Sequence, residues 1–256
     1  MKIATTKTLS NLFLILLIGI IVSCTGGEKS EETEDADAED SYAAEAPEEW
    51  ITLFDGESLN GWKRYNADEI GPLWTVEDGM IKCDGTGLGE GSGDMGGSLV
   101  TIDKFGNFEL ALEWKISEGG NSGIMYHVVE MPEYGHAYET GPEYQVLDDT
   151  GWTGDLKESQ KAGSNYDMFA APESKKLNPA LEWNTSKIRY EDGKVTHWLN
   201  GELTVEFDEA SDDYKERYEN SKWVGFPGWN KYKEGGIALQ DHGAPVWYRN
   251  IRIKRL

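Results

Sequence analysis

Four polar stretches interrupt the apolar alternation of the sequence, and their side chains could do chemistry. Polar groups are costly inside a β structure unless they are paired, so repeated interruptions of this kind indicate a site. Carboxylates and imidazoles move protons, and carboxamides form paired hydrogen bonds with hydroxyl groups. The chain also has 10 Trp, and indole faces beside carboxylates and amides are typical of sugar-binding sites. The candidates are Asn121, Ser122, His127, Glu143, Gln145, Asp148, Trp152, Trp183, Asn184, His197, Gln240, Asp241 and His242.

One of these stretches places an acid and an amide on the same face of a strand. Glu143 and Gln145 alternate with Tyr144 and Val146, so the two polar side chains point to one side. Taken singly, a histidine on a strand is usually structural, and an Asp-Asp turn is usually a solvated loop. The number of such interruptions within one domain is what favours a binding surface.

The sequence contains no established metal or nucleotide motif, but it leaves a divalent ion open. Residues 91–96 have G-x-G-x-x-G spacing, yet no strong strand precedes them and no helix follows, so they indicate a loop. No H-E-x-x-H, C-x-x-C or EF-hand pattern is present. Glu143, Asp148 and either His242 or His127 could still supply ligands to one metal ion.

The elements that must position these residues are mostly strands. Apolar residues recur at every second position over 108–116, as expected for a half-buried strand. Asp192-Gly193 and Asn200-Gly201 separate alternating runs and predict a three-stranded meander over 188–207. Residues 236–240 and 246–254 predict two further strands, and 210–222 alone is typical of a helix. We therefore predict an all-β sandwich or jelly roll with one short helix.

The first 49 residues differ in composition from the rest of the chain. Residues 1–23 resemble a secretory signal peptide, because two lysines precede an apolar run that is too short to span a membrane. Cys24 follows that run at once, as in a bacterial lipobox, which predicts lipidation at this residue. Residues 24–49 are rich in acids and predict a disordered tether. The folded domain is then 50–256, exported and held in the cell envelope by its lipid.

Charge and cysteine content exclude other classes of protein. The chain has 24 Lys and Arg against 47 Asp and Glu, a formal net charge of −23, which argues against a nucleic-acid partner. Contact with a membrane is expected only through the lipid. Cys83 is the other cysteine, so no intrachain disulfide is expected once Cys24 is acylated. The oligomeric state is left open.

The sequence resembles the 3-keto-disaccharide hydrolase family, which was long known only as a domain of unknown function. The resemblance covers roughly residues 50–256 and implies a concanavalin/LamG-like jelly roll that acts on 3-keto-glycosides. The segments that carry it are Leu53-Phe54-Asp55-Gly56, Leu59-Asn60-Gly61-Trp62, 74–79, 120–124, 141–148, Glu182-Trp183-Asn184, 197–201, 236–243 and Arg249-Asn250-Ile251.

The resemblance suggests a reaction by elimination and hydration. A ketone at C3 acidifies the C2–H bond, so a base can form an enolate that expels the glycosidic oxygen. We expect Glu143 as the base or a metal ligand, and His242 as the acid or the enolate partner. Asp148 would orient a histidine or bind a cation. The expected substrate-binding residues are Asn121, Ser122, His127, Gln145, Trp152, Trp183, Asn184, His197, Gln240 and Asp241.

Three other interpretations fit the same residues. A carbohydrate-binding module would use the tryptophans and amides without catalysis. A conventional glycosidase would pair Glu143 with Glu139 or Asp148 as its two carboxylates. A surface adhesion protein on an acidic stalk would have no concave polar cleft.

Overall fold

The computed structural model describes residues 49–85 and 97–256. The expected signal peptide, the lipidation site at Cys24 and almost all of the expected tether lie outside these residues, and so does the glycine-rich run at 91–96. Within the described residues, no helix is both long enough and apolar enough to cross a membrane.

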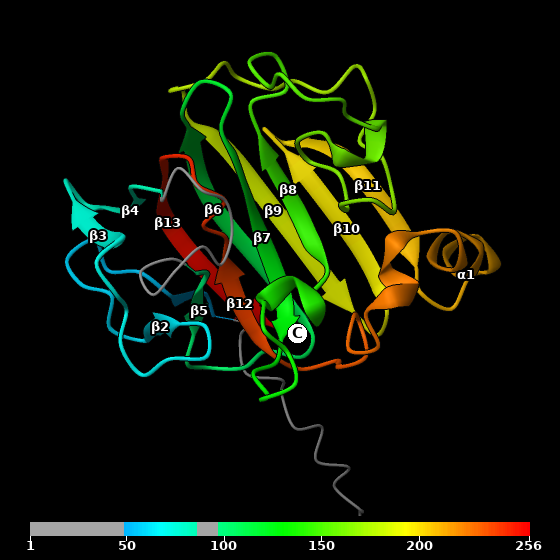
Figure 1. Ribbon diagram of the computed structural model, residues 1–256, viewed down its shortest axis with the longest axis horizontal. Coiled ribbons are helices and arrows are strands. Elements are labelled where there is room, and N and C mark those ends of the chain that lie inside the picture. Colours follow the sequence, from blue (N-terminus) through cyan, green and yellow to red (C-terminus); the bar gives the residue numbers. More distant parts are fainter. Residues whose placement is uncertain (1–48, 86–96) are drawn as a thin grey trace, which may run out of the picture. The chain divides into compact units, whose positions relative to one another are not determined.

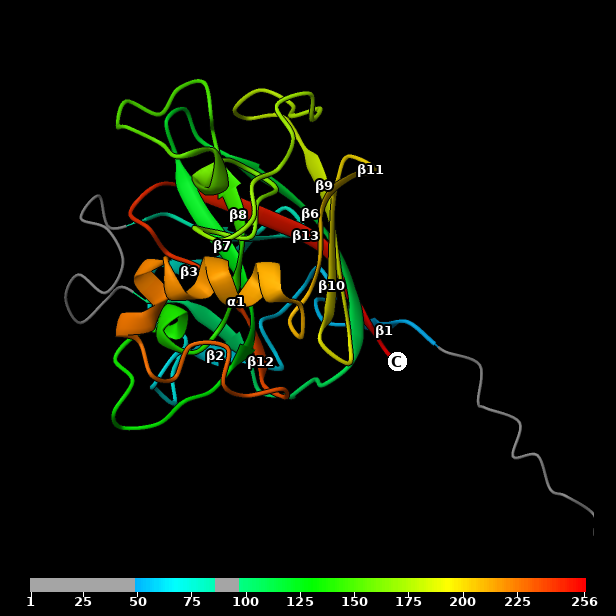
Figure 2. The same cartoon turned by 90° about the vertical axis from the view of Figure 1, so that its right-hand side faces the viewer.

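Two antiparallel sheets pack face to face, as the predicted sandwich requires (Figure 1). Figure 2 shows the two layers edge-on. The larger sheet contains β1 (Ile51–Thr52), β3 (Trp74–Glu77), β4 (Met80–Cys83), β6 (Phe108–Ile116), β9 (Asn184–Glu191), β10 (Lys194–Leu199), β11 (Glu202–Asp208) and β13 (Val246–Arg255). Its strand order is β11-β10-β9-β6-β13-β4-β3, with β1 added on β13.

The smaller sheet has the order β2-β5-β12-β7-β8, so strands that are distant in sequence are neighbours in it. Its members are β2 (Trp62–Arg64), β5 (Leu99–Thr101), β7 (Asn121–Val128), β8 (Glu143–Leu147) and β12 (Gly236–Leu239). The segments that carry the polar interruptions at 121, 143 and 240 therefore come together in three adjacent strands.

The core lies between the two sheets. Buried and partly exposed residues alternate along the whole of β6, from Phe108 to Ile116, as its sequence predicts. Tyr144 and Val146 of β8 are fully buried on the facing side. Burial of a large apolar side chain contributes roughly 1.5–3 kcal/mol, so this layer holds the sheets together.

The predicted meander is confirmed, and its turns explain the Asx-Gly pairs. Asp192 and Gly193 have φ of 48° and 85°, and Asn200 and Gly201 have φ of 49° and 82°. Two consecutive residues with positive φ form the tight hairpin turn that Asn-Gly and Asp-Gly favour.

The predicted helix exists but is shorter than expected. The α-helix α1 spans Asp212–Glu219, and Ser211 caps it by accepting a hydrogen bond from the backbone of Tyr214. Ser221 then starts a separate 3-10 helix because its hydroxyl accepts from Trp223 N at 3.1 Å. The 3-10 helices are η1 (Ala137–Glu139), η2 (Glu158–Gln160) and η3 (Lys222–Gly225).

Candidate active site

A cavity of about 100 Å³ lies on the face of the smaller sheet that points away from the core. Five of its lining residues are candidates from the sequence, and they come from β7, β8 and the segment after β12. The remainder come from η1, η3 and the loop after η2. The lining residues are Asn121, Tyr138, Glu143, Gln145, Tyr166, Lys222, Trp223, Gln240 and His242.

Strand register brings the polar side chains of the sheet together. Gln145 lies opposite Gly123 in the β7–β8 pair, and Glu143 lies opposite Met125. Gln240 N donates to Gly123 O at 2.9 Å, which continues the ladder past the end of β12. Because alternate residues of a strand share a face, Glu143, Gln145 and Gln240 point to the same side of the sheet.

Gly123 makes the room that the Glu143 carboxylate occupies. A Cβ built on Gly123 would lie 2.6 Å from Cδ of Glu143 and would overlap its carboxylate oxygen. Any larger residue would therefore displace the acid. Glu143 is 4% exposed, so its carboxylate is held in a confined position.

The carboxamide of Gln145 uses one of its polar atoms in a hydrogen bond within the cavity, while its oxygen has no such bond. Gln145 Nε2 donates to Asn121 Oδ1 at 3.1 Å, which fixes both amides. Gln145 Oε1 is buried and has no hydrogen-bond partner within the described residues. A buried acceptor of this kind costs free energy unless a ligand supplies a donor, and a sugar hydroxyl is such a donor.

The loop after η2 and the 3-10 helix η3 bring a cation to the acid. Tyr166 N donates to Glu143 O at 2.9 Å, and Trp223 Nε1 donates to Tyr166 O at 3.1 Å. Lys222 Nζ lies 4.4 Å from the centre of the Tyr166 ring and 4.3 Å from that of Trp223. Burial and the negative charge of Glu143 raise the pKa of Tyr166 to about 12. Lys222 and Glu143 both line the cavity, so an ammonium group and a carboxylate share it.

His242 completes the cavity as a neutral base. Burial lowers the pKa of His242 below its ordinary value, and the positive charge of Lys222 lowers it further, against the opposing effect of Asp241. A lowered pKa keeps the imidazole unprotonated at neutral pH, so it can accept a proton.

Asp148 and Asp241 bind loop backbone instead of lining the cavity. Asp148 accepts hydrogen bonds from Gly119 N at 2.8 Å and from Thr150 N at 3.2 Å. Asp241 accepts from Gly97 N at 3.3 Å and from Gly243 N at 3.0 Å. These bonds point both carboxylates into their own turns, so the structure does not bring Asp148 or Asp241 together with the residues that line the cavity.

The metal site that the sequence left open does not form. Its three proposed ligands are separated, since Glu143 and His242 line the cavity and Asp148 does not. Across residues 49–85 and 97–256, no group of three or more His, Cys, Asp or Glu side chains could hold a metal ion.

Ser122, His127 and His197 belong to the core, not to the site. The Ser122 hydroxyl lies 2.6 Å from Gln240 O and 2.7 Å from the Tyr248 hydroxyl. His127 Nε2 lies 2.9 Å from Gly106 O. His197 is fully buried against Tyr126 and Tyr144. Ser122 and His197 point inward because they sit at core-facing positions of their strands. His127 directly follows the inward-facing Tyr126, and its positive φ of 56°, at a bulge in the β7–β12 pairing, turns its ring inward as well.

These buried histidines make the fold sensitive to acid. Burial lowers the pKa of His127 to about 4 and that of His197 to about 3, from 6.5. The unfolded chain takes up these protons first, so stability is lost as the pH falls from about 6.5 towards the folded values. The free energy of unfolding, measured with urea, should fall between pH 7 and pH 4.5 in the wild type. We expect this fall to be about 2–3 kcal/mol smaller in His197→Leu, which lacks one of the two buried histidines. Equal acid losses in both proteins would contradict this.

The remaining candidates also lie elsewhere. Trp152 packs against the core. The Arg249 guanidinium carbon lies 3.9 Å from the centre of the Trp183 ring, on the outer face of the larger sheet. Asn184 Oδ1 accepts from Asn178 N at 2.9 Å and from Asn200 Nδ2 at 2.7 Å, which joins two turns. None of the three lines the cavity.

Sequence reasoning missed Lys222, Trp223, Tyr138 and Tyr166, which also line the cavity. The helix expected over 210–222 would end at Lys222, which gave no reason to place this residue in a site. The available signal was Ser221, because a serine directly before a new helical turn indicates a second start.

Comparison with known proteins shows the family of this chain. Residues 49–254 match the model of the 3-keto-alpha-glucoside-1,2-lyase-like domain. The chain is 35% identical to a 3-keto-disaccharide hydrolase of Bacteroides thetaiotaomicron, over 94% of this chain and 96% of that protein.

Solved structures agree on the architecture. A crystal structure from Parabacteroides distasonis, provisionally described as a glycosyl hydrolase, is 40% identical with a TM-score of 0.72, over 81% of this chain and 94% of that one. A Bacillus subtilis protein with a galectin-like fold has a TM-score of 0.50 at 10% identity, over 81% of this chain and 94% of that one, which supports the fold alone. The chain is thus an enzyme with a jelly-roll fold that acts on sugars, and it belongs to the 3-keto-alpha-glucoside-1,2-lyase-like family.

Proposed function

We propose that this protein hydrolyses glycosides whose sugar ring carries a ketone at C3, by elimination followed by hydration. The observation that carries the proposal is the set of proton-transferring and charged groups around one cavity: one carboxylate, one ammonium and one neutral imidazole, beside carboxamides. The family and its 3-keto-disaccharide hydrolase relative support the substrate class.

The cavity favours elimination over the reaction of a conventional glycosidase. That reaction needs two carboxylates on either side of the scissile bond. Glu139 accepts hydrogen bonds from Gly135 N and His136 N, both at 2.9 Å, and Asp148 is held in its own turn. Glu143 is the one carboxylate among the described residues that line the cavity. A single base is enough when a neighbouring ketone acidifies the proton.

In the first step, the Glu143 carboxylate removes the proton from C2. The C–H electron pair forms the C2–C3 double bond, and the charge moves to the ketone oxygen. The Lys222 ammonium stabilises this enolate oxygen, as oxyanion-stabilising groups do in a confined site. The carboxamides of Gln145, Asn121 and Gln240 hold the ring hydroxyls.

In the second step, the enolate re-forms the ketone and the C1–O bond breaks. The leaving oxygen takes the proton from Glu143, which restores the carboxylate and leaves a C1–C2 double bond. Water then adds at C1 while His242 accepts its proton, and the proton passes from His242 to C2. The lowered pKa of His242 suits it for this role as a base, whereas the expectation from the sequence was an acid or an enolate partner. The net reaction consumes one water and releases the 3-keto sugar.

The test is to incubate the purified protein with a 3-keto-glucoside and with its unoxidised parent, in D₂O. We expect cleavage of the ketone alone, with deuterium at C2 of the released sugar beyond that found in a protein-free control. Cleavage of both glycosides, or release without deuterium at C2, would contradict elimination. Cleavage of neither would favour a binding module.

A further inference from the structure

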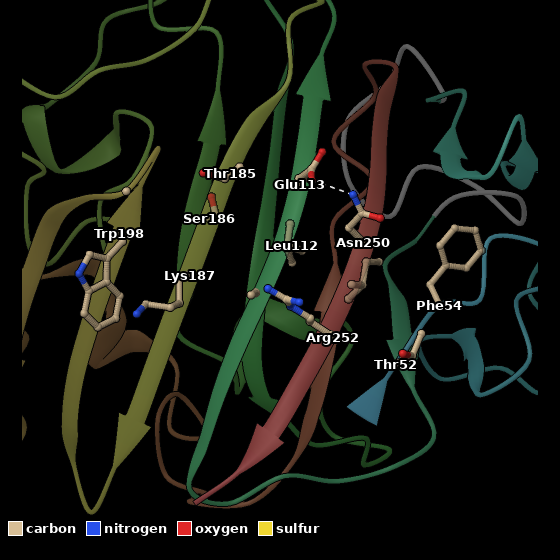
Figure 3. A pocket seen from close by; sticks show the side chains of 13 residues that line it. Thr52, Phe54, Leu112, Glu113, Thr185, Ser186, Lys187, Trp198, Asn250 and Arg252 are labelled. Atoms are coloured by element: carbon tan, nitrogen blue, oxygen red, sulfur yellow. Dashed lines mark hydrogen bonds between the residues drawn. The ribbon is translucent and has the colours of Figure 1, made fainter. Parts of the chain in front are cut away.

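A second hollow, of about 570 Å³, lies on the outer face of the larger sheet, which faces away from the candidate active site. It crosses β10, β9, β6 and β13. Figure 3 shows the side chains that line it, from Trp198 on β10 to Arg252 on β13, with Phe54 beyond. Its volume falls in the range of small-molecule sites and far exceeds what a simple ion needs. The reaction proposed above uses none of its residues.

Strand register aligns the residues that shape this groove in one row. Trp198 lies opposite Lys187, Lys187 lies opposite Ala111, and Ala111 lies opposite Arg252. Thr52 of β1 continues the row beyond Arg252. Neighbours in such a row stand about 5 Å apart. Because Ala111 is small and lies between the long side chains of Lys187 and Arg252, a space remains above it, and this space is the hollow.

A bulge in β13 moves Asn250, the next residue that could fill the groove, out of the regular strand pairing. The pairing of β13 with β6 shifts between Arg249 and Arg252, and Asn250 adopts a φ of 53°. Asn250 Nδ2 donates to Glu113 Oε1 at 2.7 Å, which draws its side chain to the rim of the groove.

The two cations of the row are poorly neutralised. Within the described residues, no carboxylate forms an ion pair with Arg252, whose guanidinium carbon lies 4.8 Å from the centre of the Trp50 ring. Lys187 Nζ lies 3.9 Å from a Glu109 oxygen, the outer limit of an ion pair, and 3.9 Å from the centre of the Trp198 ring.

The acid at the rim is already neutralised by other groups. Glu113 Oε2 accepts from Arg249 Nε at 2.8 Å and pairs with its Nη2 at 2.7 Å. Residues 50–256 hold 36 Asp and Glu against 21 Lys and Arg, yet the described lining of this groove has two cations, Lys187 and Arg252, against one carboxylate, Glu113. The groove is therefore suited to an anion.

We propose that this groove binds a uronic acid unit of a glycan, at a site separate from the candidate active site. The sugar carboxylate pairs with Arg252, because a guanidinium matches the two oxygens of a carboxylate, and Lys187 adds a second positive charge on the other side of Ala111. The ring lies over Ala111, and Lys187 together with the Trp198 indole that it contacts forms the far wall of the groove. Thr52 and Thr185 supply hydroxyls at the rim.

The probe is a galacturonic acid trisaccharide, compared with its neutral methyl ester by isothermal titration calorimetry. We expect the acid to bind and the ester to bind at least tenfold more weakly. Arg252→Gln should weaken binding of the acid at least tenfold. The matched control is Arg189→Gln, which removes an exposed cation of the same sheet face that already pairs with Glu191 at 2.9 Å and should change affinity less than twofold.

Two further measurements distinguish a uronic acid site from a simple anion site and from the candidate active site. If sodium sulfate competes at the concentration of the trisaccharide, the groove is a simple anion site and the proposal is overturned. Equal effects of Arg252→Gln and Arg189→Gln on affinity would also overturn it. Turnover of the 3-keto-glucoside should be unchanged in Arg252→Gln. Binding is measured without turnover, so the calorimetric result does not depend on whether the proposed reaction is correct.

Discussion

Glu143→Gln lowers kcat on a 3-keto-glucoside by about 10²–10⁴-fold, the usual contribution of a general base. The amide has nearly the shape of the carboxylate but cannot remove the C2 proton. Because the side chain is 4% exposed in a cavity that already holds other carboxamides, we expect the fold to be kept and KM to change little. Exchange of the C2 proton for deuterium should be lost with turnover.

A second carboxylate nearby provides the control for this variant. Glu139 lies four residues before Glu143 in the sequence, but its carboxylate accepts from the backbone of Gly135 and His136. Glu139→Gln removes the same charge and should change kcat less than threefold. If Glu143→Gln retains activity within the same margin, as judged by progress curves at saturating substrate, Glu143 is not the base.

Gly123→Ala should reduce kcat at least tenfold by moving the same carboxylate rather than removing it. The added Cβ would lie 2.6 Å from Glu143 Cδ, which is closer than real Cβ atoms approach a neighbour. The Glu143 side chain must then rotate, and small displacements of an acting group cost large factors in rate. The loss should appear in kcat and in C2 exchange together.

Gly106→Ala is the matched control for this glycine. A Cβ on Gly106 would meet Lys233 O at an ordinary contact of 3.6 Å, so the same change of residue there should leave kcat within twofold. Thermal unfolding of both variants checks that each domain is folded. Full activity in Gly123→Ala would show that the confined position of Glu143 is unimportant for the reaction.

The strands and turns of this domain follow from local sequence, for a physical reason. Alternation over 108–116 specifies one buried and one exposed face, and the structure places Leu110, Leu112 and Trp114 in the core accordingly. Asp192-Gly193 and Asn200-Gly201 specify hairpins because these residues tolerate positive φ. Such preferences act between near neighbours, so they can be read without knowledge of the fold.

Selection among the candidate residues required the tertiary structure. His127, His197 and His242 cannot be separated by residue type, yet two are buried in the core and one lines the cavity. Likewise, Glu143 faces the cavity while Asp148, at the end of the same strand, turns back to bind Gly119. The difference depends on which face of each strand the opposite sheet covers, and that is decided only when distant strands pair.

The sequence alone determined the class of fold, the change in composition near residue 49, and a set of polar residues that contained Glu143, Gln145 and His242. Only the tertiary structure brought Lys222 to the cavity and aligned Lys187 with Arg252 across the outer sheet. Both arrangements join segments far apart along the chain. Their chemistry comes from long-range strand order and loop packing, which local patterns of hydrophobicity do not encode.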